Sequence, residues 1–175
     1  MKFLKILVSI IVIIAAIYVL VGLALPKTYF ISRSAEIQAA DSVVFNNVAD
    51  LNQFVKWEPW SKMDTTAKVE IKGTPAQPGH CYTWHGKKTG EGQMEIIHLE
   101  PNKQVDFKLA FIQPWQSVAD TKFIFEPINQ GTKVTWTMSG ENKSFLERWM
   151  MLCMKGSMEK QFDEGLADLK KLCEG

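Results

Sequence analysis

The stretch "TKVTWTMSG", residues 132–140, alternates between two kinds of side chain. Val134, Trp136 and Met138 fall on one face of an extended chain, and lysine, threonine and serine side chains fall on the other. Because a β-strand points successive side chains to opposite sides, the pattern predicts a strand with one covered face and one face in water. The question it raises is whether Trp136 faces a filled core or a cavity that holds another molecule.

Similar segments precede this one, separated by short turns that contain Gly, Pro or Asn. The further predicted strands are residues 29–37, 67–73, 80–86, 90–100, 104–112 and 117–127. Short connections join antiparallel neighbours, so six of the strands form a meander, and residues 29–37 would complete a seven-stranded antiparallel sheet by joining its edge.

Two amphipathic helices are predicted around the sheet. One follows Asp41, which we expect to cap it. The other begins at Ser144, where Glu147 three residues later completes a capping box, and a second apolar stripe covers its last four turns. Whether Gly156 and Ser157 kink or interrupt this helix stays open. A sheet with one apolar face and a helix with one apolar stripe cover each other, which predicts an α+β fold with a curved sheet wrapped around the carboxy-terminal helix.

The first 26 residues differ from the rest, because Ile6 to Leu25 carry no charge. A helix of about 20 apolar residues is roughly 30 Å long and spans a bilayer. Two interpretations remain open: a retained transmembrane anchor over residues 1–26, or a signal peptide cleaved after Gly22-Leu23-Ala24. Signal-peptide cores usually have about 7–15 residues, which favours the anchor. Lys2 and Lys5 weakly favour a cytoplasmic amino terminus, with the soluble domain outside the cytoplasm.

Residues 27–175 suffice for one domain. The formal net charge of +1 gives no reason to expect a nucleic-acid partner. Cys81, Cys153 and Cys173 lack metal-binding spacing and are expected to be buried thiols. We expect no metal and no other cofactor, and no catalytic motif is recognisable.

Several segments together resemble the SRPBCC superfamily, which includes START-type lipid-transfer domains, birch-pollen-allergen-like proteins and polyketide cyclase/dehydrase proteins. They are "DSVVFNNVADL" (41–51), "FVKWEPW" (54–60), "YTWHG" (82–86), "GEGQMEI" (90–96), "FIFEPINQGTKVTWTMSG" (123–140) and "FDEGLADLKKL" (162–172). The resemblance implies the helix-grip fold, in which the sheet and the long helix enclose an elongated apolar pocket. It implies a pocket more firmly than any particular ligand.

Alternation along the strands predicts a strongly aromatic inner surface, and clustered methionines on the last helix add flexible apolar side chains. His98 has the same parity as Met94 and is expected to point inward. A filled core is the competing interpretation of these residues. The candidate ligand-binding residues are Trp57, Trp60, Tyr82, Trp84, Met94, His98, Phe107, Phe111, Phe123, Trp136, Met138, Met154 and Met158.

Three functions stay open at this point. The first is a single-pass, membrane-anchored domain that binds a small hydrophobic ligand, either a lipid or an aromatic metabolite. The second is a cyclase/dehydratase-type enzyme in which His98 or Tyr82 carries a proton. The third is a protein-interaction module with a filled core, similar to the chaperone-ATPase activator branch of the superfamily.

Overall fold

The computed structural model describes residues 2–175, which form five helices and seven strands. The elements in chain order are α1 (Lys2–Ala24), β1 (Thr28–Ile37), α2 (Asp41–Ala49), α3 (Leu51–Phe54), α4 (Trp60–Met63), β2 (Lys68–Lys72), β3 (Cys81–Gly86), β4 (Gly90–Glu100), β5 (Gln104–Gln113), β6 (Ser117–Ile128), β7 (Gly131–Glu141) and α5 (Phe145–Glu174). Every predicted strand is present, with ends shifted by a few residues.

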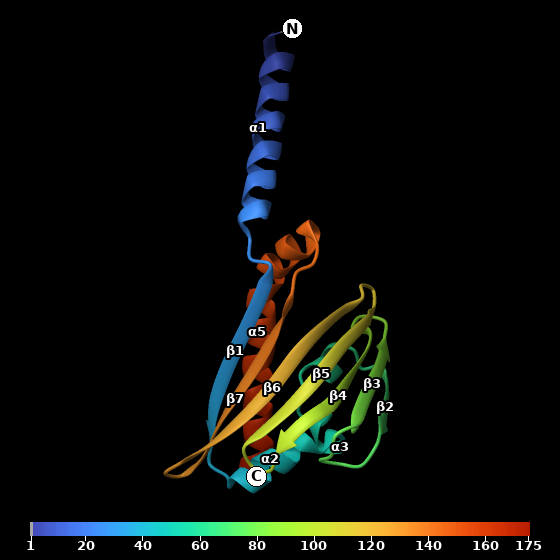
Figure 1. The fold of residues 1–175 in the computed structure, drawn as a ribbon, viewed down its shortest axis with the longest axis vertical. Coiled ribbons are helices and arrows are strands. Elements are labelled where there is room, and N and C mark those ends of the chain that lie inside the picture. The colour runs from blue at the N-terminus through green and yellow to red at the C-terminus, as the bar shows by residue number, and fades with distance from the viewer. Residues whose placement is uncertain (1) are drawn as a thin grey trace.

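The seven strands form one antiparallel sheet in the order β1-β7-β6-β5-β4-β3-β2. The meander from β2 to β7 is therefore completed by β1, which pairs with β7 from Thr28 opposite Glu141 to Ile37 opposite Thr132. The sheet curves, and α5 lies along its concave side (Figure 1). The α+β helix-grip architecture expected from the sequence is confirmed.

The capping box at the start of α5 differs in one detail from the expected one. Ser144 Oγ accepts a hydrogen bond from the Glu147 amide at 3.2 Å, as predicted. The Glu147 carboxylate, however, accepts from the amide of Lys143 at 2.6 Å, one residue before the cap. The prediction that Asp41 caps α2 is wrong, because Ala40 occupies the N-cap position and the Asp41 carboxylate instead accepts from Thr132 Oγ1 at 2.8 Å.

One half of the interior is a filled aromatic core. Its centre is Trp136, which is 2 % exposed and stacks on Phe162 of α5 with ring centroids 3.9 Å apart and planes within 10°. Phe123 stacks on the indole from the neighbouring strand at 4.8 Å, and Trp57 contacts it edge-on at 5.8 Å. This cluster fixes the second half of α5 against the sheet.

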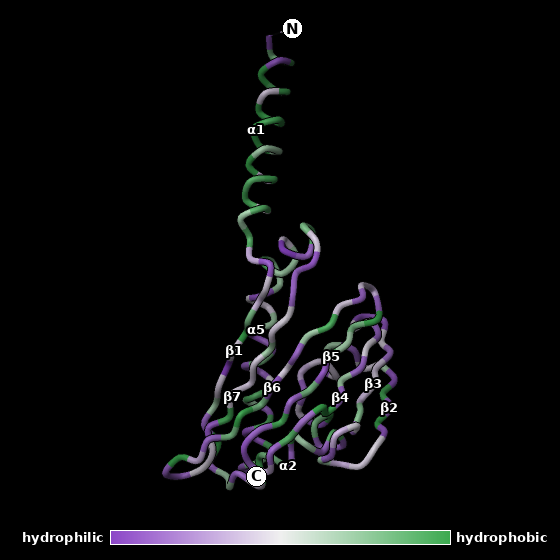
Figure 2. The backbone as a smooth tube through the Cα atoms, in the orientation of Figure 1, coloured by the Kyte–Doolittle hydropathy of each residue, from purple (hydrophilic) through white to green (hydrophobic). Residues whose placement is uncertain are grey.

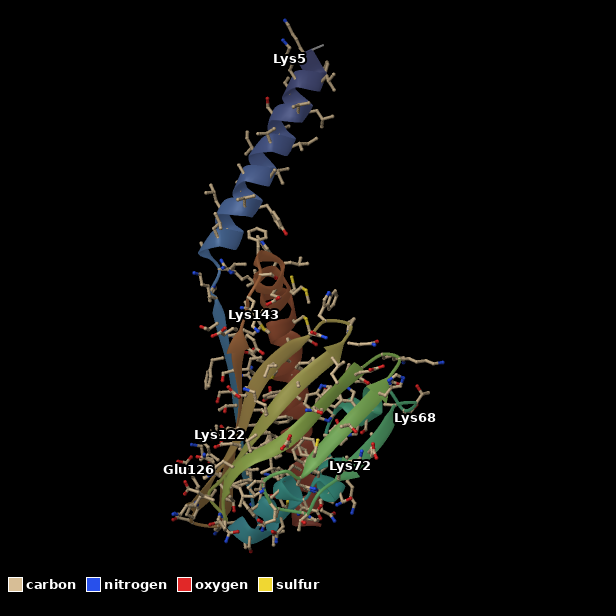
Figure 3. The ribbon with its side chains drawn as sticks, turned by 45° about the vertical axis from the view of Figure 1, so that its right-hand side comes forward. Lys5, Lys68, Lys72, Lys122, Glu126 and Lys143 are labelled. Carbon is tan, nitrogen blue, oxygen red and sulfur yellow. The ribbon has the colours of Figure 1, made fainter. Side chains whose placement is uncertain are left out.

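The α1 helix projects away from the domain and is apolar along most of its length (Figures 1 and 2). It is long and apolar enough to cross a membrane, and almost none of it is buried within the protein. Figure 3 shows Lys5 near the end of α1 that is far from the domain. The helix thus places charge at one end and the folded domain at the other.

The last turns of α1 contact the first turns of α5. The Tyr18 ring stacks on Trp149 with centroids 4.7 Å apart and meets Phe145 edge-on at 5.5 Å. Gly22 is buried in this contact, since a Cβ there would lie 2.2 Å from the Phe145 ring. We call the contact made by Tyr18, Gly22, Phe145 and Trp149 the α1–α5 junction.

Candidate functional site

A cavity of about 310 Å³ lies between the sheet and the first half of α5. Strands β2 to β7 form its wall and the filled core lies beneath it. Its mouth is bordered by α4, by the segment that follows α4, and by the β3–β4 turn. The side chains from the strands and from α5 that line it are Val69, Tyr82, Trp84, Met94, Leu109, Phe111, Thr121, Trp136, Met138, Met154, Met158, Gln161 and Phe162.

Trp136 separates the filled core from the cavity. One side of its ring packs into the aromatic cluster, and it also borders the cavity. Its indole nitrogen donates to Thr121 Oγ1 at 2.9 Å, and that hydroxyl donates to the Thr137 carbonyl at 2.8 Å. The polar atoms at the cavity floor therefore already have partners, and the floor presents apolar surface to any ligand.

Tyr82 is one of the aromatic residues that line the wall. Its ring stacks on Trp84 at 5.7 Å, and the Trp84 indole nitrogen donates to the Thr89 carbonyl at 3.3 Å. No hydrogen bond within residues 2–175 engages the Tyr82 hydroxyl. Burial, with a smaller contribution from the charge of Glu58, raises the pKa of Tyr82 well above its ordinary value of 10.0. The group is thus a neutral hydroxyl that could donate to a ligand.

Glu58 organises α4 at the mouth. Its side chain is buried and accepts hydrogen bonds from the amides of Trp60 at 2.7 Å and Ser61 at 2.9 Å, and from the Ser61 hydroxyl. Burial raises the pKa of the Glu58 carboxyl, and these hydrogen bonds partly oppose the rise. The Trp60 indole nitrogen then donates to Gln161 Oε1 on α5 at 2.9 Å, which joins α4 to the long helix.

Asp64 fixes the segment that follows α4. One carboxylate oxygen accepts from the amides of Lys88 at 2.7 Å and Thr89 at 3.4 Å, and the other accepts from the Thr66 hydroxyl at 2.7 Å. These bonds hold the pKa of the Asp64 carboxyl well below its usual range. The charged carboxylate thereby ties the segment after α4 to the β3–β4 turn.

Nine of the thirteen candidate residues border the cavity, and four do not. Trp57, Phe107 and Phe123 belong to the filled core, where the Trp57 indole nitrogen donates to the Asn47 carbonyl at 2.9 Å. The nine that line the cavity are Trp60, Tyr82, Trp84, Met94, Phe111, Trp136, Met138, Met154 and Met158. Whether they contact a ligand stays a prediction.

The expectation that His98 points inward is wrong. The register of β4 against β5 shifts between Ile96 and His98, so an extra residue reverses the facing of the remaining strand. The His98 side chain is 57 % exposed and lies 3.9 Å from Glu100. Cys153 is exposed as well, contrary to the expected buried thiol.

Several residues that line the cavity were not among the candidates. Leu109 and Thr121 occupy inward-facing positions in the alternation of their strands, and Gln161 lies three residues after Met158 on α5. Alternation could have found the first two, and helical spacing the third. Within residues 2–175 no cluster of His, Cys, Asp and Glu could hold a metal ion.

The fold and the cavity define a helix-grip domain with an apolar interior site. The family described as "Polyketide cyclase / dehydrase and lipid transport" matches residues 30–174, and the chain belongs to that family. Its architecture is that of a ligand-binding domain or a cyclase. A search of curated proteins found no match.

Solved structures share the fold at low sequence identity. The Aha1 protein of Colwellia psychrerythraea, solved as a dimer, is 20 % identical with a TM-score of 0.59, over 83 % of this chain and 96 % of its own. Ara h 8.0201 is 11 % identical with a TM-score of 0.56, over 83 % and 97 %. The di-domain ARO/CYC protein BexL from the BE-7585A biosynthetic pathway is 12 % identical with a TM-score of 0.57, over 85 % and 51 %.

Proposed function

We propose that this chain binds a small apolar molecule in the cavity between the sheet and α5, and that α1 holds the domain at a membrane. The observation that carries the proposal is a cavity of about 310 Å³ beside a tightly filled core. Large aromatic side chains fill one half of the interior and leave the other half open. Apolar lining with few polar groups is typical of small-molecule sites.

The cavity volume limits the size of the ligand. Small-molecule pockets span about 300–1,000 Å³, so this one lies at the lower end. A cavity of about 150 Å³ holds one benzene molecule, so roughly twice that volume suits two or three fused rings or a single acyl chain. The Tyr82 hydroxyl would suit a ligand with one polar acceptor. Apolar burial would supply most of the affinity, at about 25 cal/mol per Å² before the costs of immobilisation.

The α1–α5 junction supports a retained anchor. Cleavage after Ala24 would remove Tyr18 and Gly22 and would expose the Phe145 and Trp149 rings that they cover. Exposing two large aromatic rings is unfavourable in water. We therefore infer that the mature protein keeps α1. Lysines before the span support a cytoplasmic amino terminus, with the domain on the extracytoplasmic side.

The cavity gives less support to a cyclase that depends on proton transfer. His98, one of the two proposed proton carriers, is exposed on the outside of the sheet. Tyr82 borders the cavity, but its raised pKa keeps the hydroxyl neutral and makes it a poor base near neutral pH. A binding function requires only that the Tyr82 hydroxyl donate a hydrogen bond.

Native mass spectrometry of the full chain, released gently from its own membrane, tests the proposal. The expected spectrum contains the intact chain with a bound small molecule, and N-phenyl-1-naphthylamine added as a probe should compete with that molecule. Val69 lines the mouth and is 43 % exposed, so Val69→Trp should block the cavity without disturbing the core.

Val43 on α2 is equally exposed, at 43 %, and lies outside the cavity, so Val43→Trp is the matched control. Loss of the bound mass in Val69→Trp and its retention in Val43→Trp would support the site. If both variants retain the bound molecule and the probe, the molecule is held elsewhere and the proposal fails.

A further inference from the structure

One end of the domain combines the membrane helix, the cavity mouth and a group of exposed apolar side chains. β1 begins directly after α1, and its first residue pairs with the end of β7. The antiparallel register then places the β5–β6 turn and the β3–β4 turn at this same end. Figure 1 shows both turns directed toward the α1 side of the molecule. We call this the α1-proximal end.

Exposed apolar residues concentrate at the α1-proximal end. Trp115, in the β5–β6 turn, is 63 % exposed, and Leu146 and Leu152 on the first turns of α5 are also exposed. Around the cavity mouth, Met63, Val69 and Met154 are exposed as well as lining the cavity. By contrast, charged residues lie on the outer face of the sheet and on the part of its free edge that is farther from α1, where Lys122, Glu126 and Lys72 are labelled in Figure 3.

The α1–α5 junction determines the depth at which this end lies relative to a bilayer that α1 crosses. Tyr18 lies six residues before Ala24, the last residue of α1, which corresponds to about 9 Å along the helix axis. Trp149 stacks on Tyr18, so the start of α5 lies beside the last two turns of the span. In a bilayer that α1 crosses, this level is that of the headgroups or deeper. Tyrosine and tryptophan are the residues enriched at that level.

We propose that the α1-proximal end rests on the bilayer that holds α1, with the first turns of α5 and the β5–β6 turn in the interface. The cavity mouth then opens at the lipid surface, and its ligand is an apolar molecule dissolved in that bilayer. This inference rests on the proposed anchor and binding site. We assign the bilayer as the partner of this surface because the apolar surface is continuous with α1, whose own apolar side chains already need lipid around them.

Site-specific labelling of the full chain in phosphatidylcholine vesicles tests this orientation. Single cysteines replace Trp115, Leu146 and, as the control, Val43 on α2, in a background where Cys81, Cys153 and Cys173 are serine. Each variant carries an environment-sensitive nitrobenzoxadiazole label. Lipids with a spin label in the upper acyl chain should quench the labels at 115 and 146 several-fold more than the label at 43.

The outcomes distinguish contact of this surface with the bilayer from contact with a second copy of the protein. Equal, weak quenching at all three positions overturns the proposal. A blue-shifted but unquenched label at 115 or 146 that depends on protein density in the vesicle also overturns it, because it shows contact with a second copy. Failure here while Val69→Trp still abolishes the bound mass would leave the binding function standing. Strong quenching at 115 and 146 with no bound mass would remove the binding function and leave the orientation.

Loading of a fluorescent probe into the cavity tests the same orientation without labels on the protein. Trp115→Glu with Leu146→Glu should slow loading of N-phenyl-1-naphthylamine from vesicles several-fold, because charge at the interface lifts the mouth away from the lipid. Loading of the same variant in detergent micelles should match that of the unmodified chain, which shows that the cavity itself is intact. Unchanged loading from vesicles would contradict the proposal.

Discussion

Replacing Trp136 with alanine tests whether this residue belongs mainly to the core or to the cavity wall. Removing a fully buried Trp or Phe side chain costs about 3–5 kcal/mol, and each well-placed aromatic pair adds about 0.5–1.5 kcal/mol beyond buried area. Trp136 stacks on Phe162 and Phe123 and meets Trp57 and Trp60 edge-on. We therefore expect a loss in the free energy of unfolding near the top of that range, about 4–5 kcal/mol.

The assay is thermal unfolding of the full chain in one detergent, followed by circular dichroism. For a chain of this size each kcal/mol lowers Tm by about 2–4 °C, so Trp136→Ala should lower it by about 8–20 °C. Trp84→Ala is the matched control, because Trp84 is only half-buried beside the cavity and contacts two rings, and it should cost about 1–2 kcal/mol. If the two variants lose equal stability, the division of the interior into a filled and an open half is wrong.

Three further predictions follow from single side chains. His98→Ala should change stability by less than about 0.5 kcal/mol and leave the bound mass unchanged, because the side chain is exposed; a large loss in either would contradict the β4 bulge. Burial raises the pKa of Glu58 from its ordinary value of 4.5, so the folded state binds this proton more tightly than the unfolded state. The resulting contribution to the free energy of unfolding is present below the ordinary pKa and is lost as the pH rises through the folded-state pKa, so the free energy of unfolding should depend less on pH in Glu58→Gln over this range; an unchanged pH dependence would contradict the role of this carboxyl. The pKa of Asp64 is held low, so its contribution to the free energy of unfolding is present at neutral pH and is lost only as pH falls toward the folded-state pKa. Asp64→Asn should speed hydrogen exchange at the amides of Lys88 and Thr89, and unchanged exchange would refute its role at the mouth.

The order and pairing of the strands were predictable because residue alternation and turn chemistry are local properties. Val134, Trp136 and Met138 face inward as the alternation predicted. The error at His98 arose because a single extra residue near Ile97 leaves no signature in the apolar pattern yet reverses every later side chain. Asp41 failed as a cap for a different reason, since Thr132 lies far away in the sequence and offers its hydroxyl to the same carboxylate.

From the sequence the cavity could be predicted only indirectly, because the sheet carries more aromatic surface than one helix can cover. Where the cavity begins and ends depends on which aromatic rings pack against one another. Phe107, Phe123 and Trp136 have equivalent inward positions in the strand pattern, yet only Trp136 borders the open space. The difference comes from α3 and the segment that follows it, which pack Phe54 and Trp57 into one half of the sheet's concave face. No periodicity encodes where a short irregular segment between Phe54 and Asp64 will place its rings.

The position of the filled half also explains why the open half lies at the α1-proximal end. Leu166 and Leu169 on the second half of α5 are buried in the filled core, whereas Met154 and Met158 on the first half border the cavity. Unbranched methionine side chains adapt to ligands of different shape, and branched or aromatic side chains specify a fixed core. One helix thus provides a rigid attachment to the sheet at its carboxy-terminal half and an adaptable wall at its amino-terminal half. Its first turns also contact α1, so this adaptable wall lies at the end from which a ligand dissolved in the bilayer would arrive.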